Sequence, residues 1–298
     1  MQNNEVVVDT KQKSSTYKNV ALLRAKSIFW KSIKYLACIL ASIVFILPIL
    51  TVFLASFKEY NEFYESGKLA LPHSFLNFEN FKTAFIDGGM LQGFLNTAFI
   101  LVISLTGTIL MGAMVAYVLQ RFDFKAKKLI LLIYMFPMFL PMVTTQVATF
   151  QIVSKLGLYN TLWAPIVLYL GADVMSIFII MQFMESIPFS NDEAAMLEGA
   201  SYFYIFRKLI LPLLKPAIAT IIIIRGVGIY NDFYTPYLYA PGDGLGTVAT
   251  SLQKFIGPFG GQWNVICAGV ILIMIPTLII FLCLQKYIYN GFTAGAVK

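Results

Sequence analysis

The sequence predicts an all-α membrane protein with six transmembrane helices and both termini in the cytoplasm. Of its 298 residues, 58% are hydrophobic and 12% are charged, and the mean hydropathy is +0.75. About a quarter of the residues of a soluble domain are charged. The apolar residues form continuous runs that reach the roughly 20 residues needed to cross a bilayer as a helix. The runs show no strict alternation, so helices and not a β-barrel are expected.

The apolar runs divide the chain into six spans between two polar tails. The Lys-rich segment 1–34 is long and precedes a run of span length, which indicates a retained anchor and not a cleaved signal peptide. The expected organisation is an N-terminal tail 1–34, a six-helix transmembrane domain 35–290 and a C-terminal tail 291–298. The predicted spans are about 35–57, 93–118, 129–151, 162–184, 215–238 and 265–287.

Basic residues orient the bundle. Sixteen Lys and Arg residues lie in the two tails and in the connections after the second and fourth spans, whereas five lie in the opposite loops. Cytoplasmic loops carry the excess of Lys and Arg, so both termini are expected on the cytoplasmic side. This topology accounts for the net charge of +7 without a nucleic-acid partner.

The chain has no phosphate-binding motif of the form GxxxxGK[ST], so any ATP and Mg²⁺ are expected on a partner ATPase and no cofactor is expected on this chain. No metal site or disulfide is expected either. His73 lies in a predicted loop, and the cysteines lie in predicted spans, where Cys usually packs as a small apolar residue. They are Cys38, Cys267 and Cys283.

The connection between the fourth and fifth spans has the pattern of two short helices. Ser190 with Glu193 three residues later predicts a capping box that starts the first helix. Gly199 supplies a flexible point from which a second helix can leave at an angle. Pro212 and Pro216 then mark the entry to the fifth span. On these grounds alone, an interfacial helix without a partner is an equally good interpretation.

The same connection resembles the "EAA" loop of bacterial ABC importer permeases, and this resemblance favours a coupling loop at 187–214. The matching residues are Glu193, Ala194, Ala195, Glu198, Gly199 and Pro212. In that family the loop docks into a cleft of an ATPase subunit. The resemblance implies that Glu193 faces a basic residue of the ATPase, that the alanines allow close approach, and that Gly199 sets the bend.

Two further stretches resemble the carbohydrate-uptake branch, and in particular the maltose-type second permease subunit. Tyr230, Asn231, Asp232 and Phe233 are similar to its "WNDF" signature, with Tyr for Trp, and the C-terminal residues 291–297 look like its tail. The resemblance implies a type I ABC importer permease fold in a bacterial plasma membrane. It also implies a second homologous permease, a dimer of ATPase subunits, an extracytoplasmic solute-binding protein and a carbohydrate substrate, with lipid around the spans.

Charged residues inside spans point to a substrate pathway, because an ion facing lipid is costly. Arg225 and Asp232 are seven residues apart in the fifth span and are expected to share one face, and Asp173 lies in the fourth. An ion pair between Arg225 and Asp173 that only stabilises the bundle is one interpretation. The other is a polar path lined by residues that suit sugar hydroxyls and rings, in which an unpaired Arg225 would favour an acidic saccharide. The candidate pathway residues are Gln146, Asp173, Arg225, Tyr230, Asn231 and Asp232.

Three alternatives remain. An ABC permease could carry another solute, such as a polyamine, phosphate or an amino acid. An ion-coupled secondary transporter would use Asp173 and Asp232 as ion sites and would act without ATP. An integral-membrane enzyme is disfavoured because no cluster of His, Cys or carboxylates has catalytic spacing.

Overall fold

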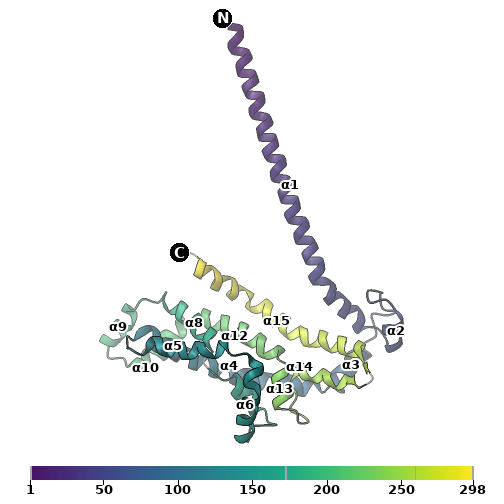
Figure 1. Cartoon of the computed structure of the whole chain (residues 1–298), viewed down its shortest axis with the longest axis vertical. Coiled ribbons are helices and arrows are strands. Elements are labelled where there is room, and N and C mark those ends of the chain that lie inside the picture. Colours follow the sequence, from purple (N-terminus) through teal and green to yellow (C-terminus); the bar gives the residue numbers. More distant parts are fainter. Residues whose placement is uncertain (1, 172, 259, 297–298) are drawn as a thin grey trace.

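The computed structural model describes residues 2–171, 173–258 and 260–296, and helices dominate this part of the chain. Figure 1 shows an elongated bundle from which the first helix, α1 (Gln2–Ser56), projects. Three helices are long and apolar enough to cross a membrane, and six such spans result if three bent helix pairs each count as one. The predicted number of six corresponds to this larger count.

Helix α1 runs through the expected boundary at residue 34, so the polar N-terminal segment and the first span form one helix. Its segment Ser27–Ser56 meets the criteria for a membrane span. Helix α15 (Trp263–Ala296) packs against α1 and extends into the predicted C-terminal tail. The last two residues of that tail, 297 and 298, lie outside the described residues.

Helix α4 (Met90–Arg121) is the axis of the bundle. It packs against α7 (Trp163–Tyr169), α8 (Val174–Met184) and α12 (Lys215–Asn231). Small residues allow the close approach that holds helices together in lipid. Ala113 and Ala116 are fully buried, and a Cβ atom placed on Gly112 would lie 3.7 Å from the Cβ of Ser176.

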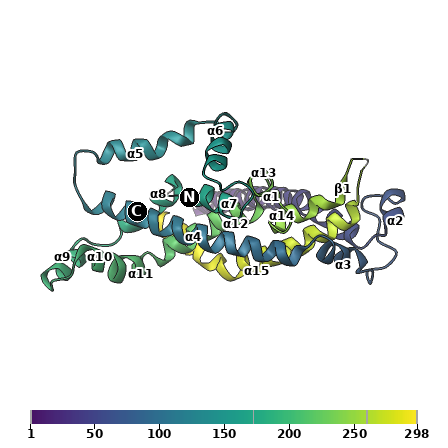
Figure 2. The ribbon, with the colours of Figure 1, turned by 90° about the horizontal axis from the view of Figure 1, so that it is seen from below.

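Prolines stand at a sharp bend in the predicted third span. Helix α5 (Lys127–Met135) continues into the 3₁₀ turn Phe136–Phe139, and α6 (Met142–Lys155) then turns away by 105°. Pro137 and Pro141 stand at this bend, where each removes a backbone N–H that a straight helix would need. Figure 2 shows α5 standing apart from α4, in agreement with the absence of buried residues in α5.

The helical segments Tyr202–Leu213 and Lys215–Asn231 meet at an angle of 70°, and the predicted fifth span begins with the second of them. The first segment comprises α10 (Tyr202–Ile205), a π-helical turn (Phe206–Ile210) and α11 (Leu211–Leu213). Helix α7 and helix α8 meet at 46°.

Short elements close the end of the bundle that carries the start of α4. They are α2 (Tyr60–Glu65), α3 (Glu79–Ile86), α13 (Tyr234–Tyr239), α14 (Val248–Ser251), the 3₁₀ turn Leu252–Phe255 and the strands β1 (Ile256–Gly257) and β2 (Gly260–Gly261). The two strands pair antiparallel, with Ile256 opposite Gly261.

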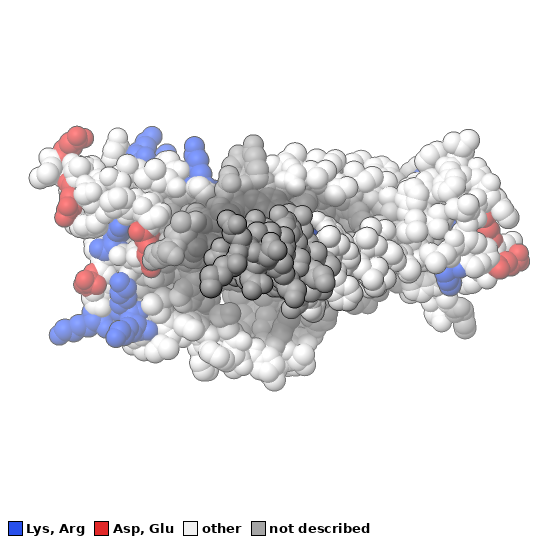
Figure 3. Space-filling view, turned by 90° about the horizontal axis from the view of Figure 1, so that it is seen from above, with Lys and Arg blue, Asp and Glu red and all other residues white. Residues whose placement is uncertain are grey.

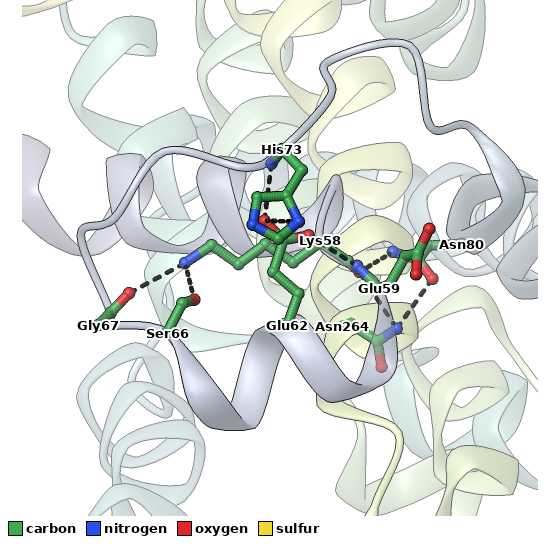
Figure 4. A network of polar contacts seen from close by, with 8 residues as sticks. All are labelled: Lys58, Glu59, Glu62, Ser66, Gly67, His73, Asn80 and Asn264. Atoms are coloured by element: carbon green, nitrogen blue, oxygen red, sulfur yellow. Dashed lines mark hydrogen bonds and ion pairs between the residues drawn. The ribbon is translucent and has the colours of Figure 1, made fainter.

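A buried polar network joins the segments at this end (Figure 4). Lys58, only 2% exposed, donates from Nζ to the Ser66 hydroxyl at 2.8 Å and to the Gly67 carbonyl at 2.9 Å. The Asn80 amide donates to the carbonyl of Lys58 at 2.8 Å, and the Asn264 amide donates to Asn80 Oδ1 at 2.9 Å. The network therefore ties the end of α1 to α3 and to the start of α15.

Candidate coupling segment and membrane polar cluster

The predicted coupling loop lies at the other end of the bundle, where α4 finishes. It begins with α9 (Ser190–Leu197), which is followed by the bend at Gly199 and by α10. In Figure 3 basic side chains gather over this end of the molecule, together with several acidic ones. The basic residues of α4, α5 and the coupling segment are Arg121, Lys125, Lys127, Lys128, Arg207 and Lys208.

The predicted capping box at Ser190 is wrong. Ser190 is already the first helical residue, Phe189 takes the N-cap position, and no side chain caps this helix. The chain turns into the helix directly from Pro188, whose carbonyl accepts from the backbone N–H of Asn191 at 3.2 Å. A serine cap does occur on the next helix, where Ser201 accepts from the backbone N–H of Tyr204 at 3.3 Å.

The predicted bend at Gly199 is confirmed, and it has a defined geometry. Gly199 has φ of +83°, a left-handed conformation that glycine adopts without steric cost. Its N–H donates to Met196 O at 2.9 Å, and the N–H of Ala200 donates to Ala195 O at 3.0 Å. This pair of bonds is the Schellman motif that ends a helix.

The candidate coupling residues do not all point the same way. Glu193, Ala194 and Glu198 are exposed, and Leu197 between them is 90% exposed. Ala195 instead packs against the core formed by α4, α8, α10 and α12. Pro212 is also exposed. The outer surface of α9 therefore includes two carboxylates, a small residue and a protruding leucine, beside the exposed Ser190 and Asn191.

Sequence reasoning missed a buried ion pair behind this surface. Arg121 Nη2 lies 3.1 Å from Asp192 Oδ2, and the two side chains are 8% and 2% exposed. Arg121 also donates to the carbonyl of Ile187 at 3.0 Å. Residues 192 and 193 point about 100° apart on a helix, but this spacing alone does not show which carboxylate is buried.

Asp173 and Arg225 form an ion pair, as one of the two interpretations predicted. Arg225 Nε lies 3.2 Å from Asp173 Oδ2, and the side chains are 33% and 22% exposed. The sequence predicts Asp173 inside a helix, whereas in the structure it lies at the N-cap of α8. There its carboxylate accepts from the backbone N–H of Ser176 at 3.2 Å and from its hydroxyl at 2.5 Å. Asp is favoured at this position because it satisfies a free N–H group of the first turn.

Asp232 also lies at a break, so the expected helical face shared with Arg225 is wrong. Helix α12 ends at Asn231, and the backbone of Asp232 is extended. Its carboxylate accepts from the Tyr169 hydroxyl at 2.8 Å, from the Thr235 hydroxyl at 2.6 Å and from the Thr235 N–H at 3.1 Å. These contacts join α7 to the start of α13.

The other candidate pathway residues are dispersed. Asn231 is exposed and donates to the Val227 carbonyl at 3.0 Å. Tyr230 is 7% exposed and donates to the Ile273 carbonyl of α15 at 2.8 Å, so its hydroxyl is occupied within a helix interface. Gln146 is partly exposed on α6, one turn before Phe150.

Two hollows flank these polar groups. One, of about 370 Å³, lies between the α5 bend and the start of α8, and Asp173, Pro137 and Tyr134 line it. The other, of about 300 Å³, lies beside the start of α4 and is lined by several glycines together with Gln92, Tyr237, Asp243 and Lys254. Each hollow has room for a small polar solute.

The structure is thus a helical membrane bundle in which a surface-exposed helix, a glycine bend and a second short helix connect two spans. Residues 108–293 match the family described as "Binding-protein-dependent transport system inner membrane component". The chain belongs to this family, which confirms the resemblance noted in the sequence and places the protein in the inner membrane.

Curated relatives extend over most of the chain. The chain is 31% identical to the melibiose/raffinose/stachyose import permease protein MelC of Bacillus subtilis, over 92% of this chain and 98% of the relative. It is 30% identical to the probable starch degradation products transport system permease protein AmyC of Thermoanaerobacterium thermosulfurigenes, over 87% and 94%. It is 29% identical to the arabinooligosaccharides transport system permease protein AraQ of Halalkalibacterium halodurans, over 85% and 91%.

A solved structure has the same fold. It is a chain of a bacterial ABC transporter involved in the import of the acidic polysaccharide alginate. It matches with a TM-score of 0.76 at 23% identity, and the match covers 89% of this chain and 98% of that one. A second structure of a bacterial alginate ABC transporter, in complex with a periplasmic protein bound to alginate pentasaccharide, matches with a TM-score of 0.59 at 20% identity, over 86% of this chain and 96% of that one.

Proposed function

We propose that this chain is the transmembrane permease subunit of an ATP-driven, binding-protein-dependent importer of an oligosaccharide. The observation that carries the proposal is the exposed surface of α9, followed by the Gly199 bend, between spans α8 and α12. The docking surface for an ATPase subunit is formed by Glu193, Ala194 and Glu198. Leu197 inserts into that ATPase subunit. Leu197 is 90% exposed, so a partner that covers it would remove its apolar surface from water, which favours association.

The end that carries α9 faces the cytoplasm in this proposal, and both termini lie on the same side. The basic residues around the ends of α4 and α5 and on the π-helical turn support this orientation, because cytoplasmic segments carry the excess of Lys and Arg. The polar network of Lys58, Asn80 and Asn264 then lies at the outer end.

The working complex contains four kinds of protein. A second homologous permease packs beside this chain, a dimer of ATPase subunits holds ATP and Mg²⁺, and an extracytoplasmic binding protein delivers the solute. Helix α5 supports the need for a membrane partner, because this chain buries its residues only in part and none of them fully. Lipid covers the rest of the apolar surface.

An oligosaccharide is the proposed solute, because the relatives described above are named for arabinooligosaccharides, for starch degradation products and for melibiose, raffinose and stachyose. Asp173, Arg225, Asn231, Asp232 and Gln146 contribute the polar groups of the pathway. Tyr230 supports the pathway wall from behind, since its hydroxyl is bonded to α15. Arg225 keeps a third of its side chain exposed while paired, which suits a contact with a sugar hydroxyl or carboxylate.

An ion-coupled carrier is the competing function. It would need a carboxylate that exchanges an ion, but Asp173 and Asp232 each accept several hydrogen bonds from neighbouring groups. These hydrogen bonds stabilise the bundle, and binding and release of an ion at either carboxylate would have to break them.

Reconstitution distinguishes the two functions. The chain alone, and the chain with its co-purifying partners, are placed in proteoliposomes and supplied with radiolabelled maltodextrin, arabinooligosaccharide, alginate oligosaccharide, phosphate or spermidine. We expect the chain alone to be inactive and the complex to take up one class of oligosaccharide when ATP is enclosed with the ATPase subunits. Uptake by the chain alone under an ion gradient would establish the carrier function instead.

A further inference from the structure

One arginine holds the start of the coupling segment to the end of α4. Arg121 is the last residue of α4, and its guanidinium contacts three consecutive features of the segment that follows α8. It donates to the carbonyl of Ile187 at 3.0 Å, lies 5.6 Å from the centre of the Phe189 ring, and pairs with Asp192 at 3.1 Å. We call this group the Arg121 clamp.

The Arg121 clamp is dry and has few ways to rearrange. Arg121 and Asp192 are 8% and 2% exposed, and the hydroxyl of Tyr117 lies within hydrogen-bonding distance of the second Asp192 oxygen, at 3.4 Å. An ion pair removed from water is strongly dependent on its geometry, because neither charge can be compensated by solvent if the pair separates. The carboxylate of α9 is therefore held at the end of α4 as long as both side chains stay buried.

Aromatic contacts extend the same junction to the second half of the coupling segment. The ring of Tyr117 lies 5.5 Å from that of Phe206 in the π-helical turn, and the ring of Phe122 lies 5.1 Å from that of Tyr202 in α10. These ring contacts pack the end of α4 against the second half of the coupling segment, whereas the Arg121 clamp holds the first half.

We infer that Arg121 is a positioning residue for energy coupling: through Asp192 and the Ile187 carbonyl it makes α9 and the cytoplasmic end of α4 move as one body, so that displacement of α9 by the ATPase is carried directly into the central helix of the bundle. This inference rests on the proposed function of α9 as the ATPase-docking helix. The force passes to α4 through Asp192, the α9 side chain that faces away from the docking surface.

The geometry explains why both members of the acidic pair at 192 and 193 are needed. Glu193 is exposed and Asp192 is 1% exposed, so one of the two consecutive carboxylates faces solvent and the other faces the bundle. One is available to a partner and the other holds the Arg121 clamp. A force applied to the outer surface of α9 is then resisted by a fixed contact on its inner surface.

The test uses the full importer complex in proteoliposomes, with uptake and ATP hydrolysis measured on the same preparation. The variants are Arg121→Gln, Asp192→Asn, the double variant that carries both changes, and Arg121→Lys. Asp123→Asn is the matched control, because Asp123 is two residues away, fully exposed and 3.9 Å from Lys127. Retention of the ATPase subunits during purification reports assembly separately from coupling.

We expect Arg121→Gln and Asp192→Asn to keep the ATPase subunits but to reduce solute transported per ATP hydrolysed by about tenfold or more, which corresponds to about 1.4 kcal/mol of lost coupling. The double variant should be no worse than either single variant, since both changes remove one interaction. Arg121→Lys should recover part of the coupling, because it keeps the charge. Asp123→Asn should behave as the unaltered complex.

Equal losses of uptake and hydrolysis, or loss of the ATPase subunits from the variants, would assign the Arg121 clamp to folding alone and overturn the inference. Unchanged coupling in well-assembled variants would overturn it as well. Failure of the unaltered complex to couple uptake to ATP would instead contradict the proposed function, so the two failures are distinguishable.

Discussion

Arg225 of α12 and Asp173 at the start of α8 form an ion pair across a break in the fourth span, with Nε and Oδ2 3.2 Å apart. The pair lies beside the hollow under the α5 bend, so it is partly open to solvent. It joins two helices of the membrane bundle, where an isolated charge is costly.

Neutralising one member of this pair should destabilise the assembled protein. Breaking a buried pair costs about 3 to 5 kcal/mol. Because these side chains are 33% and 22% exposed, we expect a smaller cost of about 1 to 3 kcal/mol for Arg225→Gln or Asp173→Asn. The measurement is the thermal unfolding midpoint of the detergent-purified complex.

The double change Arg225→Gln with Asp173→Asn should recover most of that stability, because no uncompensated charge remains. If instead Arg225 reads an acidic sugar, Arg225→Gln will unfold at the normal temperature and lose uptake of charged oligosaccharides more than of neutral ones. A stable and fully active Arg225→Gln complex would contradict both roles.

Reversing the charge at position 193 should abolish uptake and leave the spans inserted. Glu193 is exposed on α9 and contributes nothing to the core, so Glu193→Lys should lose ATPase co-purification by about tenfold or more. Glu185→Lys is the control, since Glu185 is an exposed carboxylate at the end of α8 outside α9. Normal co-purification and uptake of Glu193→Lys would remove α9 from the docking surface.

A side chain at position 199 should be disfavoured by the backbone conformation of the bend and not by a lack of space. No atom lies within 4 Å of a Cβ placed on Gly199, but its φ of +83° makes a side chain cost about 1 to 2 kcal/mol. Gly199→Leu should therefore reduce uptake severalfold by misdirecting α10. Gly157 is a matched control, with φ of +69°, equally open space and a position outside the coupling segment.

Both glycine variants should lose similar stability in a thermal unfolding assay, and only Gly199→Leu should lower transport. Equal loss of transport in Gly157→Leu would mean that any strained turn impairs the protein and that the bend has no special part.

The contact between α4 and α14 should be intolerant of a single methyl group. A Cβ on Gly93 would lie 3.1 Å from the backbone N and Cα of Val248, where no side chain can yield. Thr97 completes this junction by accepting from the Val248 N–H at 3.0 Å. We expect Gly93→Ala to cost about 1 to 3 kcal/mol. Gly228→Ala in α12, with nothing within 4 Å, should leave the unfolding midpoint unchanged or raise it.

Features that depend on local chemistry could be predicted from the sequence. Long apolar runs require helices in lipid, and a glycine between two helix-forming stretches predicts a bend, which the structure has at Gly199. The Arg225 pair could be predicted because a charge in a span needs a partner and few are available.

Features that depend on which way a side chain points could not be predicted. Tyr230 stands next to Asn231, but their environments differ because helix packing buries one ring and leaves the next amide exposed. Asp173 and Asp232 were expected inside helices, yet each stands where a helix is interrupted, since an aspartate competes well for the free N–H groups at such a break. Arg121 resembled an ordinary loop cation, and its burial arises from segments distant in sequence.

The Lys58, Asn80 and Asn264 network sets an order of assembly for the protein during synthesis. Asn264 is 206 residues beyond Lys58 in the sequence. Its side-chain amide donates to the Lys58 carbonyl at 3.4 Å and to Asn80 Oδ1 at 2.9 Å. At about 5 to 20 residues per second, a ribosome takes about 10 to 40 s to make the intervening chain. For that time the Asn80 side-chain oxygen lacks its partner from α15, so the first span and its loop wait in an unfinished state. Helix α15 is thus the element that completes this end of the bundle.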